Sequence, residues 1–168
     1  MSLYLNLVEK LNMVVKYLLG LMIATMSVLI LTQIFTRFVI NYPLHWTEEL
    51  ARYLMIYSVF LGAAVAIRYN RLIAIEAIAQ AMSETKRLWL KRFVMLLTIV
   101  FSSLVIIYGI DILGAVKNQT SAGLRIPMNI PYFAIPLGAG LMIINAIAVM
   151  IDGGKSHYPK ESEETTWQ

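Results

Sequence analysis

The residues with the clearest capacity for chemistry lie in one short motif, WTEELAR, at positions 46–52. On a helix, Arg52 follows Glu48 and Glu49 by about one turn, and a carboxylate on the same face lowers the cost of placing a guanidinium near a membrane. One interpretation is a self-contained helix start, with acids where the helix dipole favours them. Two acids and one base leave a surplus negative charge, however. We therefore predict a wider polar cluster at one membrane face, comprising Arg37, Trp46, Glu48, Glu49, Arg52 and Asp111.

This cluster predicts assembly or docking and not catalysis, because its charges are expected to pair with one another. A membrane enzyme would instead gather His, Asp or Cys at one face. The chain has no cysteine, and its two histidines, His45 and His157, lie outside the apolar stretches. These counts exclude thiolate nucleophiles and haem held by paired axial histidines. We expect no catalytic residue, no cofactor and no metal ion.

Four long apolar stretches must position the cluster. They cover residues 14–40, 47–67, 93–116 and 131–151. Crossing the hydrocarbon core takes about 20 predominantly apolar residues, and backbone amides in lipid must be paired within the span, so each stretch is expected to be a helix. The prediction is an all-α integral membrane protein with four transmembrane helices and short interfacial amphipathic helices. Residues 1–155 form one domain, and residues 156–168 form a polar cytoplasmic tail.

The distribution of basic residues predicts the orientation of these spans. Ten of the fourteen lysines and arginines lie at the two ends of the chain or between the second and third spans, where residues 68–92 carry six. Positive residues next to spans remain on the cytoplasmic side. Both termini are therefore expected to be cytoplasmic. The same asymmetry explains the net positive charge without a nucleic-acid partner, because no soluble domain is available to present a basic surface.

Two shorter segments are candidates for interfacial helices. Residues 72–84 are too short to span and show one polar stripe at i, i+4, i+7 and i+11 from Glu76, with Ile75, Ile78 and Met82 on the apolar remainder. This segment lies at the lipid interface, packs on a partner protein, or merely connects two spans. Residues 2–12 form either a separate amphipathic helix on the inner surface or an extension of the first span.

The interiors of the spans carry only mild polar groups, such as Asn145. No acid or base lies near a midplane, whereas an ion-driven carrier normally keeps an ionisable residue there. This counts against independent transport. Small residues at positions 62–64 and 138–140 are expected to let helices pack closely.

The motif Trp46-x-Glu48-Glu49-x-x-Arg52, followed by FLGAA at residues 60–64 and a basic exit at Arg68, resembles the small membrane subunit of the tripartite ATP-independent periplasmic (TRAP) transporters. Residues 124–138, with the pattern LxIP…YFxIPLG, resemble it as well, so the likeness covers nearly the whole chain.

The resemblance implies a bacterial inner-membrane complex of three proteins. A large multi-span membrane subunit would hold the substrate and sodium sites. A periplasmic substrate-binding protein would deliver an organic acid, such as a carboxylate or sialic acid, and this chain would brace the large subunit among the membrane lipids. The alternative is a self-contained small transporter that assembles as an oligomer, which predicts an ionisable residue in mid-span.

Overall fold

The computed structural model describes residues 2–42, 44–69 and 83–152, and every contact given below lies within these ranges. Four long helices are present: α1 (Ser2–Phe38), α2 (His45–Arg68), α4 (Glu84–Ala115) and α6 (Ala134–Ile151). A one-turn helix, α5 (Asn129–Tyr132), precedes α6. All four long helices are long and apolar enough to cross a membrane, which confirms the predicted fold class.

Helix α1 decides between the two alternatives that the sequence left open for residues 2–12. Residues 2–12 continue into the first span as one helix of 37 residues, so the structure selects the extension over a separate surface helix. No proline or glycine interrupts the sequence before Gly20, which is why the helix does not break. Val8 and Asn12 are buried against the rest of the chain, and the hydroxyl of Tyr4 donates to the carbonyl of Ile144 at 3.0 Å.

The second interfacial candidate lies almost wholly outside the described residues. The structure describes Ser83, which is exposed, and the start of α4 at Glu84. The predicted role of Ile75, Ile78 and Met82 therefore stays a prediction. Helix α4 begins nine residues before the predicted third span, because the basic stretch 86–92 is helical and continues directly into the apolar residues.

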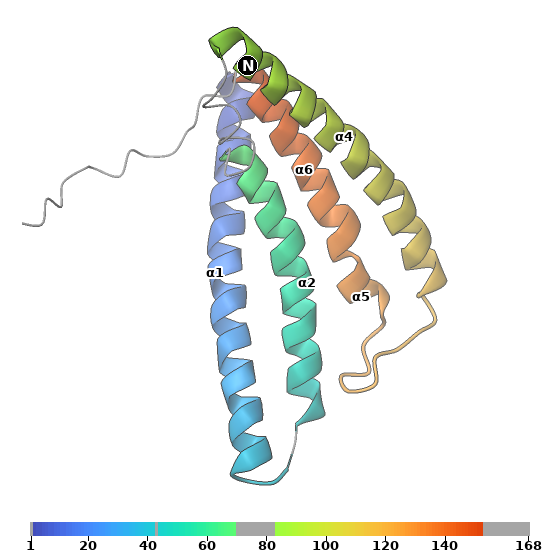
Figure 1. Cartoon of the computed structure of the whole chain (residues 1–168). Coiled ribbons are helices and arrows are strands. Elements are labelled where there is room, and N and C mark those ends of the chain that lie inside the picture. Colours follow the sequence, from blue (N-terminus) through green and yellow to red (C-terminus); the bar gives the residue numbers. More distant parts are fainter. Residues whose placement is uncertain (1, 43, 70–82, 153–168) are drawn as a thin grey trace, which may run out of the picture.

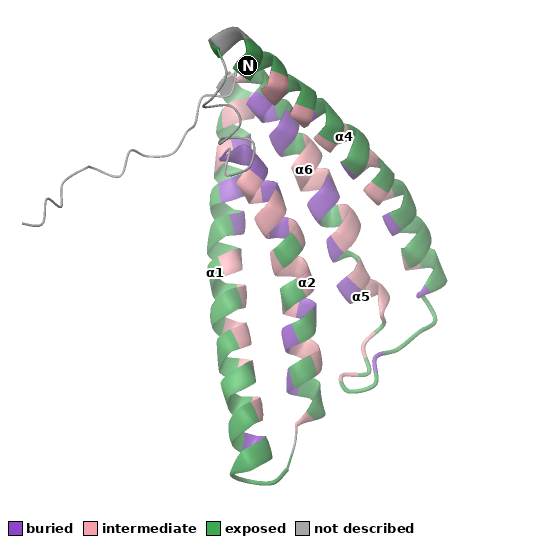
Figure 2. Ribbon diagram, viewed as in Figure 1, coloured by how far each residue is buried: buried purple, intermediate pink, exposed green. Residues whose placement is uncertain are grey.

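The helices form an open layer and not a closed bundle (Figure 1). Helix α2 packs between α1 and α6, and α6 packs between α2 and α4. Within the described residues α1 and α4 make no contact, so they form the two edges of the layer. The helices converge at the end that carries the N-terminus and diverge toward the loops at the opposite end. Figure 2 shows that α1 and α4 are exposed over most of their length, as expected for helices that face lipid or a partner.

Close packing between α2 and α6 depends on Gly138. A Cβ added at Gly138 would lie 2.5 Å from the Cβ of Phe60, and Ala64 and Ala139 are both 1% exposed. The prediction of small-residue packing is confirmed for Gly138. It is wrong within this chain for Gly62, because an added Cβ there would meet no heavy atom within 4 Å. Gly140, on the exposed side of α6, has the same open space.

Candidate functional site

Glu48 is the centre of a small polar cluster at the diverging end of the layer, here called the outer end after the orientation expected from the basic residues. The guanidinium of Arg52 donates from Nη2 to Glu48 Oε1 at 3.1 Å, and Gln33 of α1 donates from Nε2 to Glu48 Oε2 at 3.1 Å. The side chains of Arg52 and Glu48 are 62% and 54% exposed. An exposed pair of this kind contributes about 0 to 1 kcal/mol in water, so it adds little to the stability of the chain itself.

Glu49 performs a different task and does not pair with Arg52. Its Oε2 accepts hydrogen bonds from the backbone N–H groups of Gly123 at 2.7 Å and Leu124 at 2.9 Å. The hydroxyl of Tyr53 donates to the same carboxylate. Glu49 therefore fastens the loop between α4 and α5 to the start of α2. Arg52 lies one turn from both acids, but the Glu49 carboxylate is occupied by the loop N–H groups and by Tyr53, and Arg52 bonds Glu48.

Gly123 is required where this loop meets α2. A Cβ at this position would lie 2.5 Å from Glu49 Oε2 and 3.4 Å from the Cα of Trp46. The loop is held further by its own bonds, since the N–H of Ser121 donates to the carbonyl of Ile126 at 2.9 Å. The outcome is a fixed loop beside an open cavity of about 460 Å³, here called the outer hollow, which is lined by His45, Glu48, Glu49, Arg52, Ala122 and Gly123.

The remaining members of the predicted cluster do not join it. Trp46 is 42% exposed at the start of α2 and borders the loop. Arg37 lies at the end of α1 with its guanidinium 5.8 Å from the ring centre of Phe38. Among the residues that the structure describes, neither Arg37 nor Asp111 has an ion-pair partner. Asp111 is on α4, at the far edge of the layer from α1, so a single mutually paired cluster is not formed.

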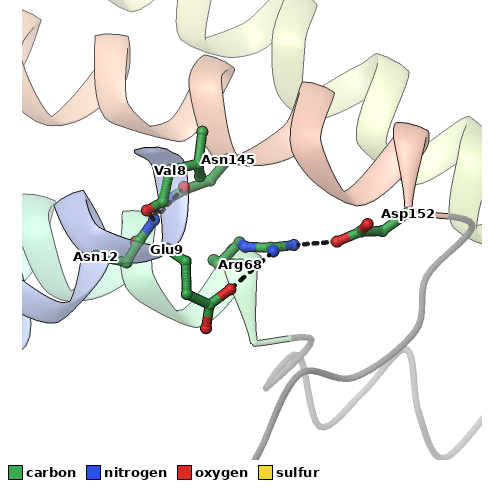
Figure 3. A network of polar contacts seen from close by, with 6 residues as sticks. All are labelled: Val8, Glu9, Asn12, Arg68, Asn145 and Asp152. Carbon is green, nitrogen blue, oxygen red and sulfur yellow. Dashed lines mark hydrogen bonds and ion pairs between the residues drawn. The ribbon is translucent and has the colours of Figure 1, made fainter. Parts of the chain in front are cut away.

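A second polar network lies at the converging end, here called the inner end after the same expected orientation, and was not anticipated from the sequence (Figure 3). Arg68 of α2 is 1% exposed and donates from Nη1 to Asp152 Oδ2 at 2.9 Å and from Nη2 to Glu9 Oε2 at 3.1 Å. These two bonds join α2 to the residue that follows α6 and to the first turns of α1. From the sequence, Arg68 was interpreted as a basic residue that sets the orientation and as part of the family resemblance, and no partner was assigned to it. Glu9 and Asp152, each beside the same membrane face, were the available signal.

Two buried amides lie next to this network (Figure 3). Asn12 and Asn145 are 0% exposed, and each donates to the other, at 2.7 and 2.9 Å. Asn145 also donates to the carbonyl of Ala64 at 2.7 Å, and Asn12 to that of Val8 at 2.8 Å. Every amide hydrogen of the pair is therefore bonded. Interhelical amide bonds of this kind hold membrane helices together, so Asn145 has a larger role than the mild polarity ascribed to it.

The two polar networks hold the helices in position, and the outer one also leaves polar side chains exposed. The inner network and the amide pair join α1, α2 and α6, while Glu49 fixes the outer loop. Within the described ranges, no group of three or more His, Asp or Glu residues is arranged to hold a metal ion. Glu48 and Arg52, which are among the exposed groups at the outer end, are suited to contact with another molecule.

Comparisons with known proteins agree on one family. Residues 26–154 match the family described as "Tripartite ATP-independent periplasmic transporters, DctQ component". The "Sialic acid TRAP transporter permease protein SiaT" of Haemophilus influenzae is 31% identical over 151 residues, which are 88% of this chain and 24% of that relative. The "Sialic acid TRAP transporter small permease protein SiaQ" of Vibrio cholerae is 32% identical over 132 residues, 76% of this chain and 73% of the relative.

A third relative differs in the substrate that it is named for. The "Isethionate TRAP transporter permease protein DctMQ" of Oleidesulfovibrio alaskensis is 29% identical over 106 residues, which are 61% of this chain and 16% of the relative. The chain thus spans about a quarter or less of the length of SiaT and DctMQ, and nearly three quarters of SiaQ.

Proposed function

Because the chain belongs to the DctQ family of small TRAP transporter permease components, we propose that it braces the large permease subunit of a sodium-coupled, binding-protein-dependent transporter. The family match over residues 26–154 carries this proposal. The chain is a multi-pass membrane protein of the non-enzymatic permease class, and its relatives imply association with a large permease subunit, to which some are fused.

The bracing role is supported by what the helices bury. Among the described residues, Arg68 is the only buried charged side chain, and it lies at the inner end, bonded to two carboxylates. An ion-coupled carrier needs ionisable or coordinating groups along its own path. We propose that the ion and substrate sites lie in the large subunit and that the periplasmic binding protein delivers the substrate to the complex.

The names of the relatives support a proposal for the substrate class. SiaT and SiaQ are named for sialic acid, a carboxylic acid, and DctMQ for isethionate, a sulfonic acid. Both are organic anions at neutral pH. We therefore propose that the complex containing this chain imports an organic acid, such as a carboxylate or sialic acid.

The proposed location is the bacterial inner membrane, with both termini in the cytoplasm. Ten of the fourteen basic residues lie on the side assigned to the cytoplasm. The start of α1 and the end of α6 lie at the same end of the layer (Figure 1), as this topology requires. Glu9 and Asp152 even share one partner there, Arg68.

Reconstitution tests the proposed function. The chain, the large subunit and the binding protein are placed together in liposomes with a sodium gradient, and uptake of labelled organic acids is measured with each component omitted in turn. We expect uptake only when all three proteins are present. Uptake by liposomes that contain this chain alone would overturn the proposal and favour a self-contained oligomeric transporter.

A further inference from the structure

One face of α2 is exposed over its outer half and half-buried at its inner end. It consists of positions spaced i, i+4, i+7, i+11, i+14 and i+18, which share one side of a helix: Glu48, Arg52, Met55, Val59, Gly62 and Ala66. Met55 and Val59 are 50% and 62% exposed, and a Cβ added at Gly62 would meet nothing within 4 Å. Since α2 packs between α1 and α6, this face belongs to a broad side of the layer and not to an edge.

This face differs in composition from the other exposed surfaces. The exposed sides of α1 and α4 carry large apolar residues, such as Leu31, Phe93 and Phe101, which suit contact with lipid tails. The α2 face instead combines an ion pair at its outer end with glycine and alanine in its inner half. An ion pair that faces lipid is costly. Small residues allow the backbone of another helix to approach closely, as at membrane helix interfaces.

The outer end of this face also offers unused hydrogen-bond donors. Both carboxylate oxygens of Glu48 are taken, by Arg52 and by Gln33. Arg52 uses only Nη2 in the bonds recorded for the described residues, and its side chain lines the outer hollow. A guanidinium presents five N–H donors and favours carboxylate or carbonyl acceptors. The complementary partner is therefore an apolar helix with an acceptor near its outer end.

We propose that this face of α2 is the seam along which one transmembrane helix of the large permease subunit packs, with its backbone closest at Gly62 and an acceptor group at Arg52. The inference rests on the proposed function, because that function supplies the occupant. Membership of the family does not indicate which face of α2 is used, that the helices approach most closely at Gly62, or that Arg52 makes the polar contact.

The chain contains a matched set of variants for testing this seam. Gly20 in α1, Gly62 in α2, Gly114 in α4 and Gly140 in α6 all have open space around an added Cβ. Leucine at any of them favours the helix, and its Cβ meets no heavy atom of a neighbouring element within 4 Å. Each variant is co-expressed with the large subunit, and the amount of large subunit that co-purifies per mole of this chain is measured. Abundance of the chain in the membrane controls for folding.

We expect Gly62→Leu to lower recovery of the large subunit about tenfold through overpacking, and the other three to remain near the wild type. Equal recovery with Gly62→Leu and the wild type would overturn the seam while leaving the proposed function standing. Loss with Gly140→Leu alone would move the contact to α6 and also overturn it. Failure of the wild-type chain to recover the large subunit would instead count against the proposed function.

Cross-linking identifies the occupant directly. The chain has no cysteine, so single cysteines at Val59 and at Leu97 of α4, both exposed, provide a test site and a control. A photoactivatable thiol reagent at position 59 is expected to yield a product with the mass of this chain plus the large subunit, and position 97 much less of it. A product with twice the mass of this chain would identify a second copy as the occupant and overturn the proposal.

Discussion

Asn12 and Asn145 exchange two amide hydrogen bonds, of 2.7 and 2.9 Å, although they lie 133 positions apart in the chain. The pair joins the first helix to the last inside an apolar layer, and Arg68 joins the same two ends of the chain a short distance away (Figure 3). The inner end of the layer is thus held by polar bonds, whereas the outer end diverges and carries the outer hollow. This asymmetry underlies the predictions that follow.

Removing one member of the amide pair should cost more than removing both. Asn145→Leu removes the bonds of Asn145 to Asn12 and to the Ala64 carbonyl, while Asn12 keeps its bond to Val8, so we expect destabilisation of about 1 to 3 kcal/mol. Asn12→Leu combined with Asn145→Leu should recover part of this loss. Thermal unfolding of the purified chain in detergent measures both. Thr25→Val is the control, since the Thr25 hydroxyl bonds only within its own helix, to Leu21. If the double variant lost as much stability as the two single variants lose in sum, the two amides would not act as a coupled pair.

Arg68→Met should destabilise the chain more than any exposed arginine variant. It leaves Glu9 and Asp152 without their shared cation, which costs as much as about 3 to 5 kcal/mol for complete burial. We expect less than that, because Glu9 is 31% exposed. Adding Asp152→Asn should restore part of the stability. Arg37→Met, at an exposed site, should change the unfolding temperature little. Equal effects at positions 37 and 68 would show that the inner network adds nothing.

Gly123→Ala should release the outer loop. The new Cβ would lie 2.5 Å from Glu49 Oε2, so either the loop or the Glu49 carboxylate must move, and the two N–H bonds between them must lengthen. The rate at which a bulky thiol reagent labels a cysteine at Ala122 should rise, and uptake by the complete transporter should fall. Gly114→Ala, where a Cβ meets nothing within 4 Å, is the matched control. An unchanged labelling rate would mean that Glu49 does not hold the loop.

Arg52→Ala should impair the complex and not the isolated chain. Its exposed pair with Glu48 contributes about 0 to 1 kcal/mol to the stability of the chain, so the unfolding temperature should scarcely change. Uptake by the full system should fall about tenfold if one interfacial contact is lost. The exchange of Glu48→Arg with Arg52→Glu separates two roles: it restores uptake if pairing is the main role, and restores little if each residue meets a fixed partner group. If the Arg52→Ala variant took up substrate at the wild-type rate, the Glu48–Arg52 pair would have no role beyond the start of α2.

Thiol labelling tests the proposed orientation. Single cysteines replace Ser83, before α4, and Ala122, in the outer loop, and both positions are exposed. A membrane-impermeant reagent added to cells with a permeabilised outer membrane should label position 122 only. Ser121 would be a poor choice, because it is 5% exposed. Labelling at position 83 and not at 122 would invert the topology.

Local features of the sequence were sufficient to predict the transmembrane helices of this protein. The number and approximate positions of the spans follow from runs of apolar residues, because transfer into lipid depends on the residues of each segment alone. The motif of residues 46–52, the FLGAA segment and Arg68 were enough to identify the family, since these are continuous stretches of chain. The i+4 spacing of Glu48 and Arg52 also predicted their ion pair, which lies within one helix.

Only the tertiary structure decided how these elements meet. Glu48 and Glu49 are adjacent and chemically equivalent, yet one pairs with Arg52 and the other binds a loop 74 positions away, because the loop folds back over one side of α2. Gly62 and Gly138 are likewise indistinguishable by type, but only Gly138 is covered by a neighbouring helix of this chain. Arg68 meets Glu9 across 59 positions and Asp152 across 84. Helical periodicity states which residues share a face, but the neighbour of that face is chosen by packing across the whole layer, and so it cannot be derived from any single segment.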